Sequence, residues 1–289
     1  MTIDVNNIHG RAMLINLNIS QWSARKTDKR AANEVTAQHG AKTSKASFYK
    51  PLVEGGELER IKTAATQART EHYRRTLPWS DNGPRILSNV GYLDYMAAIQ
   101  QLKAEFQKAV AEFVMQYPLL RQEAKRNLGT LFNDADYPDV SNIAGKFRFD
   151  VSVLPLPKGD DFRCDLGVDD VRRIQQEIEA NTRDALHDSM LDAFDRVAKV
   201  VEAYIDRLAD PKTVFRDSLV QNARDLAEVL PSLNIAGDAK LDGITTRLKD
   251  KLCSFEPDDL RKDEGARRKA YNEAMEMHKD LISFFGGAQ

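Results

Sequence analysis

Apolar residues recur every three or four positions along two long stretches of this chain, from Ile99 to Leu131 and from Val171 to Leu208. Residues three and four apart lie on one side of an α-helix. The first stretch alone is long enough for a helix of roughly 50 Å, at about 1.5 Å per residue. The pattern therefore predicts a mainly α-helical protein built on two unusually long helices. The first row consists of Ile99, Leu102, Phe106, Val110, Phe113, Tyr117, Leu120, Ala124, Leu128 and Leu131, and the second of Val171, Ile174, Ile178, Leu186, Met190, Phe194, Val197, Val201, Tyr204 and Leu208.

Both apolar rows need a cover, because a helix with one apolar side must pack that side against something. The simplest arrangement is a long antiparallel helical hairpin, coiled-coil-like, in which the rows cover each other at a crossing angle of about +20°. The alternative is that the rows are shared between the subunits of a homo-oligomer. Pro118 lies inside the first row and removes a helical hydrogen bond, so we expect a bend near Met115 to Tyr117, or a break into two helices.

A small β element is predicted by two stretches in which apolar and polar residues alternate. Met13 to Ser20 and Phe147 to Val153 both have a period of two, which is typical of a half-buried strand. An isolated strand leaves its backbone groups without hydrogen-bond partners. We therefore expect the two strands to pair, which makes the fold class mainly α (α+β).

The 289 residues divide into three consecutive segments by their patterns. Residues 1–85 combine the first strand with a basic, partly mobile region and a short helix. Residues 86–210 hold the long helical hairpin with a small strand insertion. Residues 211–289 hold shorter C-terminal helices.

Positive charge is concentrated near the N-terminus although the formal net charge of the chain is only −2. Between Gln21 and Arg85 there are 13 Lys and Arg residues against 7 Asp and Glu residues. Cations neutralise phosphates and aromatic side chains stack on exposed bases, so this region is a candidate nucleic-acid interface. The alternative is a solvated basic region that contacts the acidic remainder of a neighbouring protein. The candidate nucleic-acid-binding residues are Arg25, Lys26, Lys29, Arg30, Lys42 and Lys45, and the interleaved aromatic residues are Trp22, His39, Phe48, Tyr49 and Tyr73.

Sequence motifs for catalysis are missing from the chain. There is no Gly-rich phosphate-binding loop, no G-x-S-x-G nucleophile motif and no histidine close to Cys164 or Cys253. Asp134, Asp136 and Asp139 could hold a divalent cation, which leaves a metal-dependent enzyme as a third hypothesis, but a capped turn explains them more simply. We therefore predict a protein that is not an enzyme, with no catalytic residue, no metal site and no cofactor.

The sequence also predicts where the protein is located, because recognisable targeting signals are missing from it. The N-terminal residues lack the charged and apolar regions of a secretory signal. No stretch approaches the about 18 consecutive apolar residues that cross a bilayer. The expected location is the cytoplasm, without membrane contact.

Part of the chain resembles a known family. Residues Leu77 to Pro157 are similar to an uncharacterised family found in phages, prophages and some bacteria. The resemblance implies a phage-encoded, mainly helical protein in the host cell cytoplasm, and it supplies no functional residues. The matching motifs are Leu77-Pro78-Trp79, Arg85-Ile86-Leu87, Tyr92-Leu93-Asp94-Tyr95-Met96, Tyr117-Pro118, Leu128-Gly129-Thr130-Leu131-Phe132 and Asp136-Tyr137-Pro138.

Two functions follow as hypotheses. The leading one is a non-enzymatic phage-encoded interaction or assembly protein, which acts by self-association as a homo-oligomer or by docking to a larger complex. The other is an accessory protein in phage replication or packaging that binds nucleic acid through its basic N-terminal region.

Overall fold

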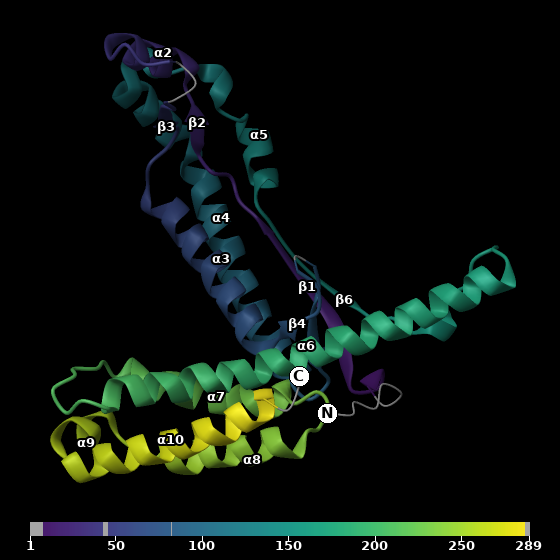
Figure 1. The fold of residues 1–289 in the computed structure, drawn as a ribbon. Helices are drawn as coiled ribbons and strands as arrows, with labels where there is room; N and C mark the ends of the chain where they lie inside the picture. The colour runs from purple at the N-terminus through teal and green to yellow at the C-terminus, as the bar shows by residue number, and fades with distance from the viewer. Residues whose placement is uncertain (1–7, 43–45, 82, 287–289) are drawn as a thin grey trace. The chain divides into compact units, whose positions relative to one another are not determined.

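The computed structural model describes residues 8–42, 46–81 and 83–286. Most of these residues are helical, and the strands form one four-stranded and one two-stranded sheet (Figure 1). This confirms the predicted fold class, mainly α with a small β element.

The chain divides into two compact units. Unit 1 comprises Met1–Asn16, His72–Met96 and Ser152–Gln289, and unit 2 comprises Leu17–Glu71 and Ala97–Val151. Each unit is therefore assembled from segments far apart in the chain, and neither coincides with one of the three consecutive segments that the sequence patterns suggested.

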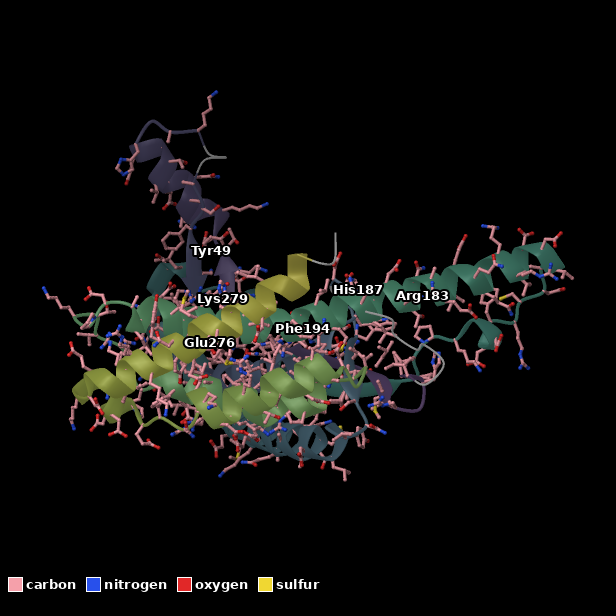
Figure 2. All side chains as sticks on the ribbon, turned by 60° about the horizontal axis from the view of Figure 1, so that its bottom comes forward. Tyr49, Arg183, His187, Phe194, Glu276 and Lys279 are labelled. Carbon is pink, nitrogen blue, oxygen red and sulfur yellow. The ribbon has the colours of Figure 1, made fainter. Side chains whose placement is uncertain are left out.

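Unit 1 is built around the long helix α6 (Val168–Leu208), which runs beside α10 (Glu264–Gly286) and α7 (Ser218–Leu233) (Figure 1). The apolar row of α6 is buried from Leu186 onward in a continuous core shared with the following helices. Figure 2 labels Phe194, which is fully buried in this core. The remaining helical elements of this part are α8 (Ala239–Arg247), the π-helical turn η6 (Leu248–Leu252) and α9 (Pro257–Lys262).

The C-terminus of α6 is closed by a buried arginine from α10. The last carbonyl groups of a helix have no partner within it, and a cation placed there also opposes the negative end of the helix dipole. Arg267 meets both needs, because its guanidinium group donates hydrogen bonds to four backbone oxygens. The acceptors are Arg207 O (2.8 Å), Leu208 O (3.4 Å), Asp210 O (2.6 Å) and Thr213 O (3.1 Å).

The first turns of α6 extend past the other helices of unit 1 (Figure 1). A returning segment that includes η5 (Gly159–Asp161) packs along them. Gly159 is required there, because a Cβ atom at this position would lie 2.8 Å from the backbone oxygen of Gln175. The apolar row is only partly covered in this stretch, where Val171, Ile174 and Ile178 are half-buried.

The four-stranded sheet has the strand order β4-β5-β1-β6. Strand β1 (Ala12–Ser20) pairs antiparallel with β5 (Arg85–Ser88), and β5 pairs antiparallel with β4 (Leu77–Pro78). On its other side β1 neighbours β6 (Arg148–Leu154). The two alternating stretches of the sequence are thus adjacent strands, as predicted.

Unit 2 contains most of α3 (Gly56–Arg75) and α4 (Tyr92–Leu128), which lie side by side and are joined by an ion pair of 2.7 Å between Arg60 and Glu112 (Figure 1). The buried side of α4 packs on aromatic residues. Phe106 contacts Phe149, Phe113 contacts Phe147 and Tyr117 contacts Trp22, with ring centroids 5.5, 5.5 and 5.8 Å apart. The shorter elements of this unit are α5 (Val140–Ile143) and the 3-10 turns η2 (Gly129–Leu131), η3 (Asp134–Asp136) and η4 (Ala144–Lys146).

The elements that cover the two long apolar rows differ from those of the expected hairpin, in which the two rows would cover each other. The row of α4 is covered by α3, Trp22 and the aromatic residues around β6, whereas the row of α6 is covered by α7 and α10. A row records only that one side of a helix is buried, and not which element buries it. At Pro118 the second of the two alternatives, a break into two helices, is not found, because α4 continues through that residue to Leu128. The bend near Met115 to Tyr117 stays a prediction.

Candidate nucleic-acid interface

Four of the six predicted basic residues, Arg25, Lys26, Lys29 and Arg30, belong to a small substructure of unit 2, which we call the basic tip. It consists of β2 (Arg25–Thr27), α2 (Lys29–Gln38) and β3 (Tyr49–Pro51), which lie together in Figure 1. Asp28 connects β2 directly to α2 and caps the helix, since its carboxylate accepts hydrogen bonds from the backbone N–H groups of Arg30 and Ala31, each 3.1 Å long. The basic tip is thus built from a two-stranded ribbon and a capped helix.

The ribbon formed by β2 and β3 has two different faces. The antiparallel register pairs Lys26 with Lys50 and Thr27 with Tyr49, and residues directly opposite in such a pair point to the same face. Lys26 and Lys50 both approach the carboxylate of Asp136, at 3.9 and 2.9 Å. We call this the inner face of the ribbon.

Lys50 is the structural centre of the inner face. Its side chain is only 4% exposed, and its ammonium group lies 2.9 Å from Asp136 and 3.2 Å from Asp28. The same group donates a hydrogen bond of 2.6 Å to the backbone oxygen of Leu131. A buried ammonium ion needs such partners, because an unpaired charge away from water is costly.

The electrostatics of this cluster favour the charged forms. Burial by itself lowers the pKa of Lys50, but its hydrogen bonds to Asp136 and Asp28 outweigh burial, so the pKa is raised above its ordinary value. The pKa of Asp28 is lowered, first by the hydrogen bond from the Ala31 N–H and then by Lys50. The single charge of Lys50 therefore offsets one of the two carboxylate charges, and Lys26 lies beside Asp136, 3.9 Å away.

The inner face is also anchored to the turn after α4. Asn133 caps η3 by accepting a hydrogen bond from the N–H of Ala135, and the hydroxyl of Tyr137 donates one of 2.8 Å to Leu52 O, directly after β3. The capped turn that the sequence favoured over a metal loop is thus present, with its Asp136 serving as a partner of Lys50.

The other face of the ribbon, together with the start of α2, is open to solvent. Of the six basic candidates, Lys45 lies outside the described residues, and the other five are exposed. These five are Arg25, Lys26, Lys29, Arg30 and Lys42. The structure thus brings exposed cations from β2 and α2 together in one substructure.

The aromatic candidates have different roles. Trp22 packs against Phe113 and Tyr117 inside unit 2. Tyr73 belongs to unit 1, where Arg85 lies over its ring at 4.7 Å. Tyr49 remains in the basic tip, next to α2 in Figure 2, and it is 63% exposed.

Two residues that organise the basic tip were missed by sequence reasoning. Lys50 was one lysine among several in a basic region, and Asp136 was considered only as part of a capped turn or as a ligand of a divalent cation. Only a weak sequence signal distinguishes Lys50 from the other lysines of this region, namely that Lys50 alternates with exposed neighbours in a short strand. The pairing itself joins positions far apart in the chain, which only the fold brings together.

Other types of site have less support. Among the described residues no three His, Cys, Asp or Glu side chains are grouped closely enough to hold a metal ion. Cys164 is exposed and Cys253 is half-buried, and both are free thiols. In the part of the chain that the structure covers, no helix is both long and apolar enough to cross a membrane.

Comparison with known proteins does not assign the chain to a family. No protein-family model, no curated protein and no solved structure matches it. The functional argument therefore depends on the residues and contacts described above.

Proposed function

We propose that this protein acts by binding, and that its basic tip binds nucleic acid. The observation that carries the proposal is the position of Lys50. By pairing with Asp28 and Asp136 on the inner face, it offsets, together with Lys26, the nearby negative charge that would otherwise oppose a phosphate backbone. Arg25 of β2 and Lys29 of α2 are exposed to solvent, where a polyanion can reach them, whereas Arg30 also pairs with Glu34 at 3.1 Å.

The start of α2 supports the same proposal. Lys29 and Arg30 occupy the first turn of the helix, where the helix dipole is positive and cations are unfavourable. An anionic ligand would relieve this repulsion. In the phage and prophage family that the sequence resembles, such a protein would be an accessory factor in replication or packaging.

Charge reversal tests the proposal better than truncation, because deletion of the N-terminal region would remove β1 from the sheet. The variant Arg25→Glu, Lys29→Glu, Arg30→Glu changes exposed residues only. Binding of labelled oligonucleotides should fall steeply with salt for the wild type, with a log–log slope of about −3 to −4 if five cations contact phosphates. The variant should lose this binding.

The matched control reverses three exposed cations of unit 1, Lys212, Arg268 and Lys269, and should bind as the wild type does. Equal loss in both variants would mean that bulk charge, and not the basic tip, is responsible. Absence of salt-sensitive binding by the wild type would refute the proposal.

Self-association is the second candidate function, and it is the leading hypothesis from the sequence. It is favoured by exposed apolar side chains at two places in unit 1, Val153 and Leu154 at the end of β6 and Leu166 and Val168 at the start of α6. Together with the half-buried part of the apolar row, they leave apolar surface that another protein surface would cover.

Light scattering after size exclusion tests this candidate. The wild type should be larger than a monomer, and Leu154→Glu with Val168→Glu should shift it to a monomer. Val214→Glu is the control, because Val214 is equally apolar and 87% exposed but lies after the end of α6. A monomeric wild type would refute self-association.

A further inference from the structure

We infer that the outer face of the basic tip binds single-stranded nucleic acid, with an unpaired base stacked on Tyr49. This inference rests on the proposed function and names the form of nucleic acid that the site recognises. Its evidence is the composition of the face opposite Lys50.

The register of the ribbon defines that face. Because Lys26 and Lys50 occupy the inner face, their neighbours along the strands point the other way. The outer face therefore carries Arg25 and Thr27 from β2, and Tyr49 and Pro51 from β3. All four residues are exposed.

A cation and an aromatic ring are neighbours on this face. Arg25 pairs directly with Pro51, and Tyr49 pairs with Thr27, so Arg25 and Tyr49 are diagonal neighbours. Such residues are about 7–8 Å apart and within reach of long side chains. This arrangement places one positive charge beside one flat apolar surface.

Single-stranded nucleic acid matches that combination. Proteins that bind it use cations along the backbone and aromatic rings on which the bases stack. In a duplex the faces of the bases are already stacked on each other, so an exposed tyrosine ring finds no free partner. The 63% exposure of Tyr49 would be a cost in water, since a large aromatic ring is usually packed, and base stacking would cover the ring.

The ribbon is held firmly enough to present these side chains. Leu52 N–H donates a hydrogen bond of 2.7 Å to Ala24 O at one end, and Asp28 N–H donates one of 2.9 Å to Phe48 O at the other. Lys50 fixes the inner face, as described above. The outer face is therefore ordered before a ligand arrives, which reduces the entropic cost of binding.

The test measures fluorescence anisotropy of the full-length protein with a labelled 20-nucleotide polythymidine strand and with a 20-base-pair duplex. We expect the single strand to bind about tenfold or more tightly than the duplex. Tyr49→Ala should weaken single-strand binding by about tenfold, and Tyr49→Phe, which keeps the ring, should stay within about twofold of the wild type. Arg25→Ala should make the salt slope about 0.7 less steep, which corresponds to one phosphate contact.

Tyr73→Ala is the matched control, because Tyr73 is 54% exposed but belongs to unit 1, and it should not change affinity. The inference is overturned if Tyr49→Ala binds the strand as the wild type does, or if the duplex binds equally well. Those outcomes leave salt-dependent binding intact, so they differ from failure of the proposed function, in which neither oligonucleotide binds. Binding of a second copy to this face in place of nucleic acid would appear in light scattering as a larger particle that Tyr49→Ala, and not Leu154→Glu with Val168→Glu, shifts to a monomer, and it would also overturn the inference.

Discussion

A buried histidine should make the stability of the protein depend on pH well above the range in which carboxylates titrate. His72 in α3 is 6% exposed, and its Nδ1 atom lies 2.8 Å from the hydroxyl oxygen of Tyr95. The phenol keeps its proton at neutral pH, because burial raises the pKa of Tyr95. The protonated hydroxyl donates to or accepts from Nδ1 according to the imidazole tautomer, and either arrangement is made with the neutral ring.

Burial, and then the nearby charge of Arg85, lowers the pKa of His72 from 6.5 to about 4. At a pH between these two pKa values, the unfolded chain binds a proton at His72 and the folded protein does not. The free energy of unfolding therefore falls as the pH falls from 6.5 towards 4. From pH 7.5 to pH 5, a shift of this size reduces it by about 2 kcal/mol.

Urea unfolding at a series of pH values measures this effect. His72→Gln keeps an acceptor for the Tyr95 hydroxyl but cannot titrate, so its stability should change by about 2 kcal/mol less than that of the wild type over the same range. His39→Gln, at an exposed position, should follow the wild type. The reasoning fails if the wild type and His72→Gln show parallel pH dependences, or if NMR titration places the His72 pKa at 6.5 or above.

Two further predictions concern the buried cations. Arg267→Met should lower the free energy of unfolding by about 3 kcal/mol, because charged hydrogen bonds to the end of α6 are lost. Arg268→Met, at the exposed neighbouring position, should change it by less than about 0.5 kcal/mol. Urea denaturation measures both variants, and equal effects would contradict this role of Arg267. Lys50→Met should destabilise the protein most at neutral pH, where Asp28 is charged, and less as the pH falls below the ordinary Asp28 pKa of 3.8. The lowered pKa of Asp28 gives stability that is present above this pH and is lost below it, so a Lys50→Met effect that is the same at pH 3 and pH 7 would contradict the assignment.

Local patterns were sufficient for most of the secondary structure. The short helix expected within residues 1–85 is α3 (Gly56–Arg75), with Ile61 and Ala68 buried at helical spacing. The start of α4 carries a similarly local signal, because the Ser88 hydroxyl accepts a hydrogen bond of 3.2 Å from Gly91 N–H just before the helix begins. Such features are visible in a sequence because helix periodicity and capping depend on residues a few positions apart.

The candidate site was predicted in composition but not in organisation. The exposed cations of the basic tip stand out in the sequence as a group, because clustered charge is visible there, and their binding of nucleic acid stays a prediction. The selection of Tyr49 over Trp22 depends on burial by Phe113 and Tyr117, which one sequence does not reveal.

The sequence by itself determined that this protein would contain two long one-sided helices, two strands that pair, and a strongly basic region near its N-terminus. The tertiary structure decided which element covers each helix, and it selected Lys50 as the buried cation that separates the inner face of the ribbon from the outer one. The physical reason is how far apart in the sequence the interacting residues lie. Periodicity and charge density are properties of neighbouring residues, whereas the ion pair of Lys50 with Asp136 joins two segments that become neighbours only when α4 and its following turn fold beside the ribbon.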